Sequence, residues 1–386
     1  MPTRRDVLRA LWASGSAAWA AAQLPSGIAD LRASSQTPTP GWRQFRATAA
    51  LTGVASAALP ATLRPRWTVD AGAPIESSAA MVDGVAYVGT LDGVLLALDS
   101  ATGSVKWRYA ATTPDYGIGS SSPAVAGGTV YVGDLSGRLH AVDVATGKPR
   151  WTFKTAMEIK SSPVVVDGTV LIGSYDAHLY ALDATSGREL WKYNTANYVH
   201  ATPAIANGVA YFGGCDEVFH GVRLATGQRV TAATLGAYTA ASPALAGGVA
   251  YFGTFDSDVL AMDLASGKIR WRFVDPEREF PFYSSAAVAA GLVVIGGRDK
   301  AVRGLDAATG KARWSFMTGA RVDGSPAIAG DRVVVGSGDG KVYVLDLASG
   351  KRLWDYDAGA GFTASPAVAG GLVIIGDSDG TIHAIG

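Results

Sequence analysis

The strongest constraint on this chain is a repeat of about 40 residues that fills most of its length. One copy, over residues 161–194, reads SSPVVVDGTVLIGSYDAHLYALDATSGRELWKYN. Its β-branched runs, its alternation of apolar and polar residues and its Gly and Asp-Gly turns predict four short strands and no helix. Because every copy must form the same unit, a repeat of this period decides the fold class.

The number of copies follows from two positions that recur in the repeat. A glycine ends the second strand eight times, and the fourth strand carries a tryptophan position that also occurs eight times. The tryptophan series begins before the first glycine and ends before the last one. The final copy therefore lacks its outer strand, while the segment around residues 66–69 has no copy of its own. The glycines are Gly89, Gly133, Gly173, Gly213, Gly253, Gly296, Gly336 and Gly376, and the second series is Trp67, Trp107, Trp151, Trp191, Thr231, Trp271, Trp314 and Trp354.

These counts predict a closed ring, because closure removes the strand edges that an open array would expose. We expect an all-β, eight-bladed β-propeller with four-stranded antiparallel blades. The last blade is expected to be completed by an N-terminal strand around Arg66–Val69.

The repeated tryptophan and aspartate have expected structural roles. A tryptophan on each outer strand can wedge between neighbouring blades and bury a large area. An aspartate before the turn glycine can accept hydrogen bonds from N–H groups of the turn. Blade four departs from both rules with Arg223 and Thr231, so we expect its outer seam to be the loosest. The aspartates are Asp99, Asp143, Asp183, Asp263, Asp306 and Asp346.

The first 41 residues lie outside the repeat. Arg4-Arg5, a short apolar stretch and Ala-x-Ala sites predict a twin-arginine export signal over residues 1–22, with a basic amphipathic helix as the alternative. Residues 23–41 are rich in Ser, Thr and Pro and predict a flexible linker, followed by the propeller over 42–386. We expect an exported, periplasmic or extracellular protein that is not a lipoprotein and keeps no transmembrane span.

Composition narrows the classes of partner. Lys plus Arg equals Asp plus Glu, 33 each, so nothing favours nucleic acid or a membrane surface. Cys215 is the one cysteine, which excludes an intrachain disulfide or a cysteine-based zinc site. His140, His220 and His383 share one slot on different blades, which favours packing between blades over metal binding. We expect no metal site.

Segments such as AVDVATGKPRW, over residues 141–151, resemble the tryptophan-docking repeats of the quinoprotein β-propellers. The resemblance covers about residues 42–386 and recurs seven times, and WRQFR at 42–46 looks like the opening of single-domain members. The family implies an eight-bladed ring and contains two functional classes. One comprises alcohol and sugar dehydrogenases that hold pyrroloquinoline quinone (PQQ) with calcium, and the other comprises non-catalytic scaffolds, including one for outer-membrane barrel assembly. The repeat itself does not distinguish these classes.

Two departures from the dehydrogenases favour a scaffold. The resemblance implies that these enzymes stack the quinone on a tryptophan floor and cover it with a disulfide between adjacent cysteines. This chain has one cysteine, and its ten tryptophans fall in the signal, the opening segment and the outer strands. We therefore expect a non-catalytic binding or assembly scaffold without a cofactor or catalytic residues. The alternative is a PQQ-dependent periplasmic dehydrogenase of alcohols or sugars.

The candidate binding site lies at the mouth of the central channel. Three residues before the Pro or Ala of each Ser-Pro or Ser-Ala pair, one position varies in charge and size, while the residues after it are small and uniform. A polar mouth suits a small polar ligand or a peptide segment of a protein partner; a solvated rim without a ligand is the alternative. The candidates in this slot are Glu76, Lys160, His200, Tyr283 and Asp323, with Glu158 and Arg321 two residues earlier in their blades.

Charge and loop length add two expectations for this mouth. Lys160 on blade three and Asp323 on blade seven should lie opposite each other with opposite charges. The loops around residues 112–116 and 277–283 are longer than the others and lead into blades two and six. They are expected to form aromatic walls on either side of a central depression, or else to reflect neutral variation in loop length.

Overall fold

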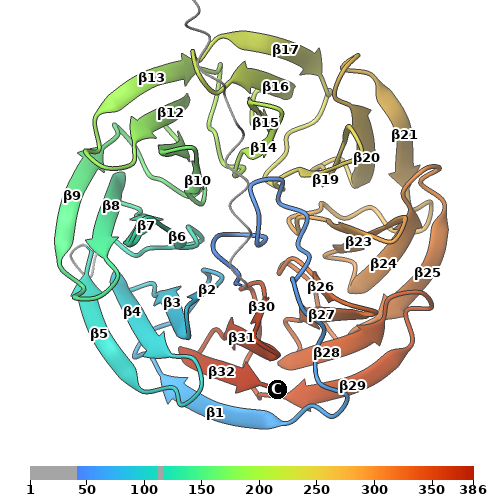
Figure 1. Cartoon of the computed structure of the whole chain (residues 1–386). Helices are drawn as coiled ribbons and strands as arrows, with labels where there is room; N and C mark the ends of the chain where they lie inside the picture. Colours follow the sequence, from blue (N-terminus) through green and yellow to red (C-terminus); the bar gives the residue numbers. More distant parts are fainter. Residues whose placement is uncertain (1–40, 112–115) are drawn as a thin grey trace, which may run out of the picture. The chain divides into compact units, whose positions relative to one another are not determined.

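The computed structural model describes residues 41–111 and 116–386, which form a ring of eight four-stranded antiparallel sheets without a helix (Figure 1). The predicted all-β, eight-bladed propeller is confirmed. The predicted signal peptide and nearly all of the linker lie outside the described residues. Blade one is β2 (Ala80–Val82), β3 (Val85–Gly89), β4 (Val94–Asp99) and β5 (Val105–Ala110); blade two is β6 (Ala124–Ala126), β7 (Thr129–Gly133), β8 (Arg138–Asp143) and β9 (Pro149–Lys154); blade three is β10 (Val164–Val166), β11 (Thr169–Ser174), β12 (His178–Asp183) and β13 (Glu189–Asn194); blade four is β14 (Ala204–Ala206), β15 (Val209–Gly213), β16 (Val218–Arg223) and β17 (Arg229–Thr234).

The remaining blades repeat the same order from the inner strand to the outer one. Inner strands have three residues and are largely buried, while outer strands alternate between exposed and half-buried residues, as a sheet with one covered face requires. Blade five is β18 (Ala244–Ala246), β19 (Val249–Gly253), β20 (Asp258–Asp263) and β21 (Ile269–Val274); blade six is β22 (Ala287–Ala289), β23 (Leu292–Gly296), β24 (Ala301–Asp306) and β25 (Ala312–Met317); blade seven is β26 (Ala327–Ala329), β27 (Arg332–Gly336), β28 (Lys341–Asp346) and β29 (Arg352–Asp357); blade eight is β30 (Ala367–Ala369), β31 (Leu372–Gly376), β32 (Thr381–Ile385) and β1 (Pro65–Asp70).

Blade eight combines strands from both ends of the described chain. β1 pairs antiparallel with β32, with Asp70 opposite Thr381 and Trp67 opposite Ala384. Arg66 adds a hydrogen bond from its Nε to the carbonyl of Gly386, at 2.7 Å. The outer edge of β32 is therefore covered by a strand that lies more than 300 residues earlier in the sequence.

The glycine at the end of each second strand, or one residue before the end in β11, leaves space for a side chain of the next blade. A Cβ atom on Gly173 would lie 2.5 Å from Val199, and one on Gly376 would lie 2.5 Å from Ile75 of blade one. Real Cβ atoms do not approach other atoms this closely, so only glycine fits where a neighbouring side chain packs onto the strand. The same contact occurs at all eight glycines and includes the seam between blades eight and one.

Outer-strand tryptophans dock onto the following blade. Trp151 donates from Nε1 to the carbonyl of Ala184 at 3.2 Å, and its ring lies against Gly187. At the seam between blades four and five, Thr231 replaces the ring and supplies no such N–H donor. The same hydrogen bond is made by Trp67, Trp107, Trp191, Trp271 and Trp314.

The aspartates before the turn glycines accept hydrogen bonds from the turns, as predicted. Asp143 Oδ1 accepts the N–H of Ala145 at 3.1 Å and that of Thr146 at 2.9 Å. Arg150 and Thr146 hydrogen-bond this carboxylate and lower its pKa to about 2. These turns stay closed because the side chain satisfies N–H groups that have no strand partner.

A closed circle of hydrogen bonds joins the inner ends of the blades. In each blade, a buried backbone N–H donates to a buried hydroxyl of the next blade, and the last bond, from Ser365 N–H to Ser78 Oγ at 3.2 Å, closes the circle. We call these eight residues the hydroxyl ring. They are Ser78, Ser122, Ser162, Thr202, Ser242, Ser285, Ser325 and Ser365.

Residues 42–55 cross the centre of the ring, where Figure 1 draws them in blue. We call them the leader segment. It binds the innermost strands of blades one to seven: Trp42 pairs with Met81 of β2, and the Gly53 carbonyl accepts the N–H of Ile328 of β26. The buried guanidinium of Arg46 donates to carbonyls of blades six and seven. Burial alone lowers the pKa of Arg46 to about 9. The leader thus satisfies N–H groups of the inner strand edges.

Removing residues 42–70 should destabilise the ring, because this deletion leaves the edge of β32 and seven inner strands without their partners. We expect association or unfolding. Size-exclusion chromatography with light scattering measures the association state, and a thermal melt measures the loss of stability. A monomeric deletion variant with an unchanged melting temperature would show that the ring does not depend on this segment.

The two last tryptophans should differ in their contribution to stability. Trp314 docks on Gly350 and donates to the Leu347 carbonyl at 2.9 Å, whereas Trp354 has no such bond among the described residues, because no turn connects β32 to β1. Trp314→Ala should lower the free energy of unfolding by about 3–5 kcal/mol. Trp354→Ala should lower it by a smaller amount, and the difference between the two variants should be about 1 kcal/mol or more. Chemical denaturation of both variants measures the difference, and equal losses would contradict the docking role.

Candidate functional site

A cavity of about 580 Å³ lies among the inner ends of all eight blades. The loop that precedes the inner strand of each blade, here called the leading loop, contributes its residue from the variable slot to the lining. The hydroxyl ring forms a second layer of lining residues, and Phe45 of the leader segment contributes an aromatic side chain. The residues from the leading loops are Glu76, Ser120, Lys160, His200, Ala240, Tyr283, Asp323 and Thr363.

All five candidates in the variable slot therefore line one cavity, and Arg321 lines it too. Glu158 is not among the lining residues; its backbone carbonyl accepts the N–H of Tyr175 at 3.0 Å. Glu76 is exposed at the edge of blade one. The residues of the variable slot lie close together because each stands two positions before a member of the hydroxyl ring. The hydrogen bonds of that ring fix the adjacent backbone.

Blades three and four supply a cluster built on Tyr175. Its hydroxyl lies 2.6 Å from Nδ1 of His200, its ring stacks on Tyr198 at 4.6 Å, and Lys160 Nζ lies 4.8 Å from its ring centroid. Burial and the charge of Lys160 lower the pKa of His200 to about 4. The imidazole is therefore neutral at pH 7 and acts as a hydrogen-bonding group rather than a second cation.

Blades six and seven supply a second cluster, built on Asp323. Arg298 binds this carboxylate in a bidentate manner, with Nε to Oδ1 at 2.8 Å and Nη2 to Oδ2 at 3.2 Å. Arg321 Nε lies 3.1 Å from Oδ2 of the same carboxylate. The Arg298 guanidinium also lies 3.6 Å from the Tyr283 ring, which packs on Phe255 at 4.8 Å between centroids.

The electrostatics of this side differ from the sequence-based expectation. We expected Asp323 to place a negative charge opposite Lys160, but two guanidinium groups share that single carboxylate. Burial lowers the pKa of Arg298, but its hydrogen bonds to Asp323 outweigh that effect and raise the pKa above its ordinary value. The Asp323 side of the cavity is therefore cationic on balance.

Arg298 is the charged lining residue that the sequence-based prediction missed. It lies two residues after the glycine of β23, in the loop between the second and third strands. The equivalent position holds Leu91, Leu135 and Tyr175 in blades one to three, so it is as variable as the slot that was chosen. The variability of this second position, in the loop between the second and third strands, was the sequence signal that could have identified Arg298.

The two long loops contribute unequally. Residues 112–115 of the first loop lie outside the described residues. In the second loop, Tyr283 lines the cavity, Phe280 is half-exposed, and Phe282 is buried against the glycine that ends β19. The second loop thus combines a structural contact with an aromatic side chain at the cavity.

The shared histidine slot serves packing between blades, as predicted. His140 Nε2 lies 3.0 Å from Asp134 in its own blade, and Nδ1 lies 3.1 Å from the Tyr109 hydroxyl of the preceding blade. The same arrangement recurs at His220 and His383. Among residues 41–111 and 116–386, no three His, Cys, Asp or Glu side chains are grouped to hold a metal ion.

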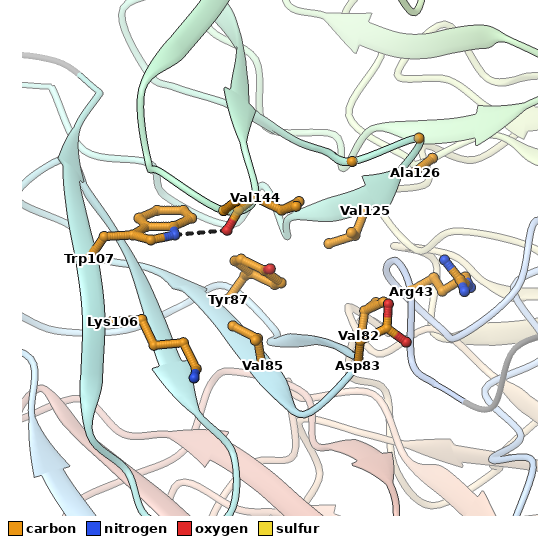
Figure 2. A pocket seen from close by; sticks show the side chains of 13 residues that line it. Arg43, Val82, Asp83, Val85, Tyr87, Lys106, Trp107, Val125, Ala126 and Val144 are labelled. Carbon is orange, nitrogen blue, oxygen red and sulfur yellow. Dashed lines mark hydrogen bonds between the residues drawn. The ribbon is translucent and has the colours of Figure 1, made fainter.

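A second hollow of about 320 Å³ lies at the seam between blades one and two (Figure 2). Figure 2 shows Tyr87 beside Trp107, whose Nε1 donates to the Val144 carbonyl, with Asp83 and Arg43 at the other end. The tryptophan contact in this hollow is the one that recurs at other seams. This hollow is therefore part of the structural contact between neighbouring blades rather than a separate candidate site.

Comparison with known proteins agrees with this architecture. The family model described as "Outer membrane protein assembly factor BamB" (PQQ_2) matches residues 4–162, 149–278 and 256–386. The chain belongs to this family. No curated protein matches its sequence.

Solved structures similar to this PQQ_2 propeller come from several classes. BamB from Moraxella catarrhalis has a TM-score of 0.71 and 19% identity, over 84% of this chain and 99% of its own. Quinohemoprotein alcohol dehydrogenase from Comamonas testosteroni has a TM-score of 0.76 and 17% identity, over 90% of this chain and 80% of its own. The computationally designed protein Ika8 has a TM-score of 0.72 and 18% identity, over 82% of this chain and 96% of its own. At such identities the similarity extends to the fold alone.

Within its described residues, the PQQ_2 propeller contains no helix of the length and apolarity needed to cross a membrane.

Stability should respond to the protonation of His200. Because its pKa is lowered from 6.5 to about 4 in the folded protein, the unfolded chain binds the proton more readily between these pH values. The free energy of unfolding should therefore fall as the pH decreases from 6.5 to 4, and His200→Gln should reduce this dependence. Chemical denaturation across this range measures it, with His178→Gln as the control. Identical pH dependence in the parent and His200→Gln would contradict the prediction.

Proposed function

We propose that this PQQ_2 propeller is an exported, non-catalytic scaffold that binds a small polar ligand or a peptide segment of a protein in its central cavity. One observation carries the proposal. The leading loop of every blade contributes its variable residue to the same cavity, while the hydroxyl ring beside that residue is nearly uniform. Residues that only support a ring can repeat from blade to blade, whereas a recognition surface needs different groups at defined positions.

Family membership supports a scaffold role. The matching family model is described as an outer membrane protein assembly factor, so binding to another protein is a role that the family contains. Export through the twin-arginine motif would bring this chain to the compartment where such assembly occurs. The half-exposed aromatic side chains of the leading loops, such as Tyr198 and Tyr238, offer apolar contact area around the cavity.

The alternative is a PQQ-dependent dehydrogenase, favoured by the fold of enzymes such as the Comamonas testosteroni protein. The residues of the cavity do not fit a quinone held with calcium. Asp323 is already bound by two arginines, and the described residues offer no group of three metal-binding side chains. Calcium takes six to eight oxygen ligands from carboxylates, carbonyl groups and waters. The cavity's aromatic residue at the leader segment is Phe45, and Cys215 has no second cysteine to pair with.

Filling the cavity should weaken ligand binding. Ala240 lines the cavity, so Ala240→Trp should exclude a ligand and weaken binding by about 2 kcal/mol or more. Ala308→Trp, on an exposed turn between β24 and β25, is the matched control and should bind like the parent. The measurements are native mass spectrometry of protein purified under non-denaturing conditions and enrichment of peptides from a random library.

Two outcomes would contradict the scaffold proposal. Equal binding by Ala240→Trp and the parent would place the ligand elsewhere. Stoichiometric binding of PQQ in a titration with calcium, together with dye-linked oxidation of alcohols or sugars, would establish the dehydrogenase instead. The thermal melt of Ala240→Trp shows whether the variant keeps the parent fold.

A further inference from the structure

Arg298 is held in one orientation before any ligand arrives. Its Nε and Nη2 bind Asp323, and its planar face lies on the Tyr283 ring, which packs on Phe255 of the preceding blade. Among the described residues, Nη1 has no hydrogen-bond partner, although the side chain lines the cavity. A guanidinium fixed in this way loses little side-chain entropy on binding and presents its remaining donors in a defined direction.

The charges of the cavity favour an anion. Lys160, Arg298 and Arg321 are cationic, while Glu76 and Asp323 are the carboxylates of the lining. Asp323 is shared by two arginines, and Lys160 makes no ion pair within the described residues. His200 adds a neutral imidazole. The excess is a single positive charge, which a monoanion balances and a doubly charged phosphate would exceed.

The rest of the lining favours an organic anion over an inorganic one. Phe45, Leu91 and Leu135 give the cavity apolar surface, and the hydroxyl ring contributes neutral polar groups. An arginine fork matches the geometry of a carboxylate through two parallel N–H···O bonds. A carboxylate attached to an apolar or aromatic group would use both kinds of surface.

We propose that the central cavity is a receptor for an organic carboxylate, with Arg298 as the recognising residue and Asp323 as the residue that positions it. This inference rests on the proposed function, since it names the chemistry of that cavity's ligand. The carboxylate could belong to a small acid or to the C-terminus of a peptide. The exposed aromatic residues Tyr198, Tyr238 and Phe280 on the leading loops are 42%, 48% and 49% exposed and would contact the longer ligand.

The test compares matched probes that differ in one charge. Isothermal titration calorimetry at pH 7 measures binding of N-acetylphenylalanine and of its neutral C-terminal amide to the full chain. The same comparison uses an N-acetylated hexapeptide that ends in phenylalanine, as free acid and as amide. Each free acid should bind about tenfold more tightly than its amide, because charge-assisted hydrogen bonds to arginine are lost in the amide.

Variants then assign this preference to Arg298. Arg298→Gln should bind acid and amide equally, while Arg298→Lys should keep part of the preference, because it retains the charge and loses the fork. The matched control is Arg313→Gln. Arg313 lies on the outer strand β25, is exposed and pairs with Asp306, so this variant should keep the full preference for acid over amide. A thermal melt verifies that each variant is folded, and Lys160→Met provides a second change of cavity charge.

The outcomes separate this inference from the function on which it rests. Tighter binding of the hexapeptide acid than of N-acetylphenylalanine identifies a chain end as the source, and equal binding identifies a small acid. Equal binding of acid and amide, or no binding of either, overturns the carboxylate inference. If Ala240→Trp still removes a ligand in that case, the cavity remains a binding site of different chemistry. If Ala240→Trp changes nothing, both proposals fail.

Discussion

The rest of the structure depends on the hydrogen bonds from each blade's backbone N–H to the hydroxyl of the next blade. All eight hydroxyl residues are buried, so removal of a hydroxyl would leave a buried N–H without its hydrogen-bond partner, which costs free energy. The circle closes from Ser365 to Ser78, which locks the spacing of all eight inner strands together. The circle of hydrogen bonds also fixes the backbone beside each variable residue. Because this backbone does not depend on the side chain of the variable residue, the fold accepts Lys160 on one blade and Asp323 on another.

The leader segment crosses the centre of the ring and contributes to the lining of the cavity. Its backbone and side chains satisfy N–H groups on the inner strands of seven blades, and Phe45 reaches the cavity lining. An innermost strand has one unpaired edge, which in this ring faces the axis. One short segment therefore both completes the hydrogen bonding of the inner strands and supplies an aromatic surface to the candidate site.

Chemistry in the cavity comes from contacts between blades rather than from any single repeat. Arg298 belongs to blade six and Asp323 to blade seven, and their ion pair with Arg321 reverses the charge expected from Asp323 alone. Similarly, Tyr175 of blade three holds His200 of blade four. The charged and aromatic side chains that distinguish this cavity thus meet across the boundaries between neighbouring blades.

The sequence by itself determined the number of blades, the glycine and tryptophan contacts, the turn aspartates and the variable slot before the inner strands, whose residues line the cavity. These follow from repetition, because every copy obeys the same steric and hydrogen-bonding requirements. The tertiary structure alone decided the register of β1 against β32, the path of the leader segment and the role of Arg298. These contacts join residues from different repeats or outside them, and a periodic pattern carries no information about which side chains meet across a seam.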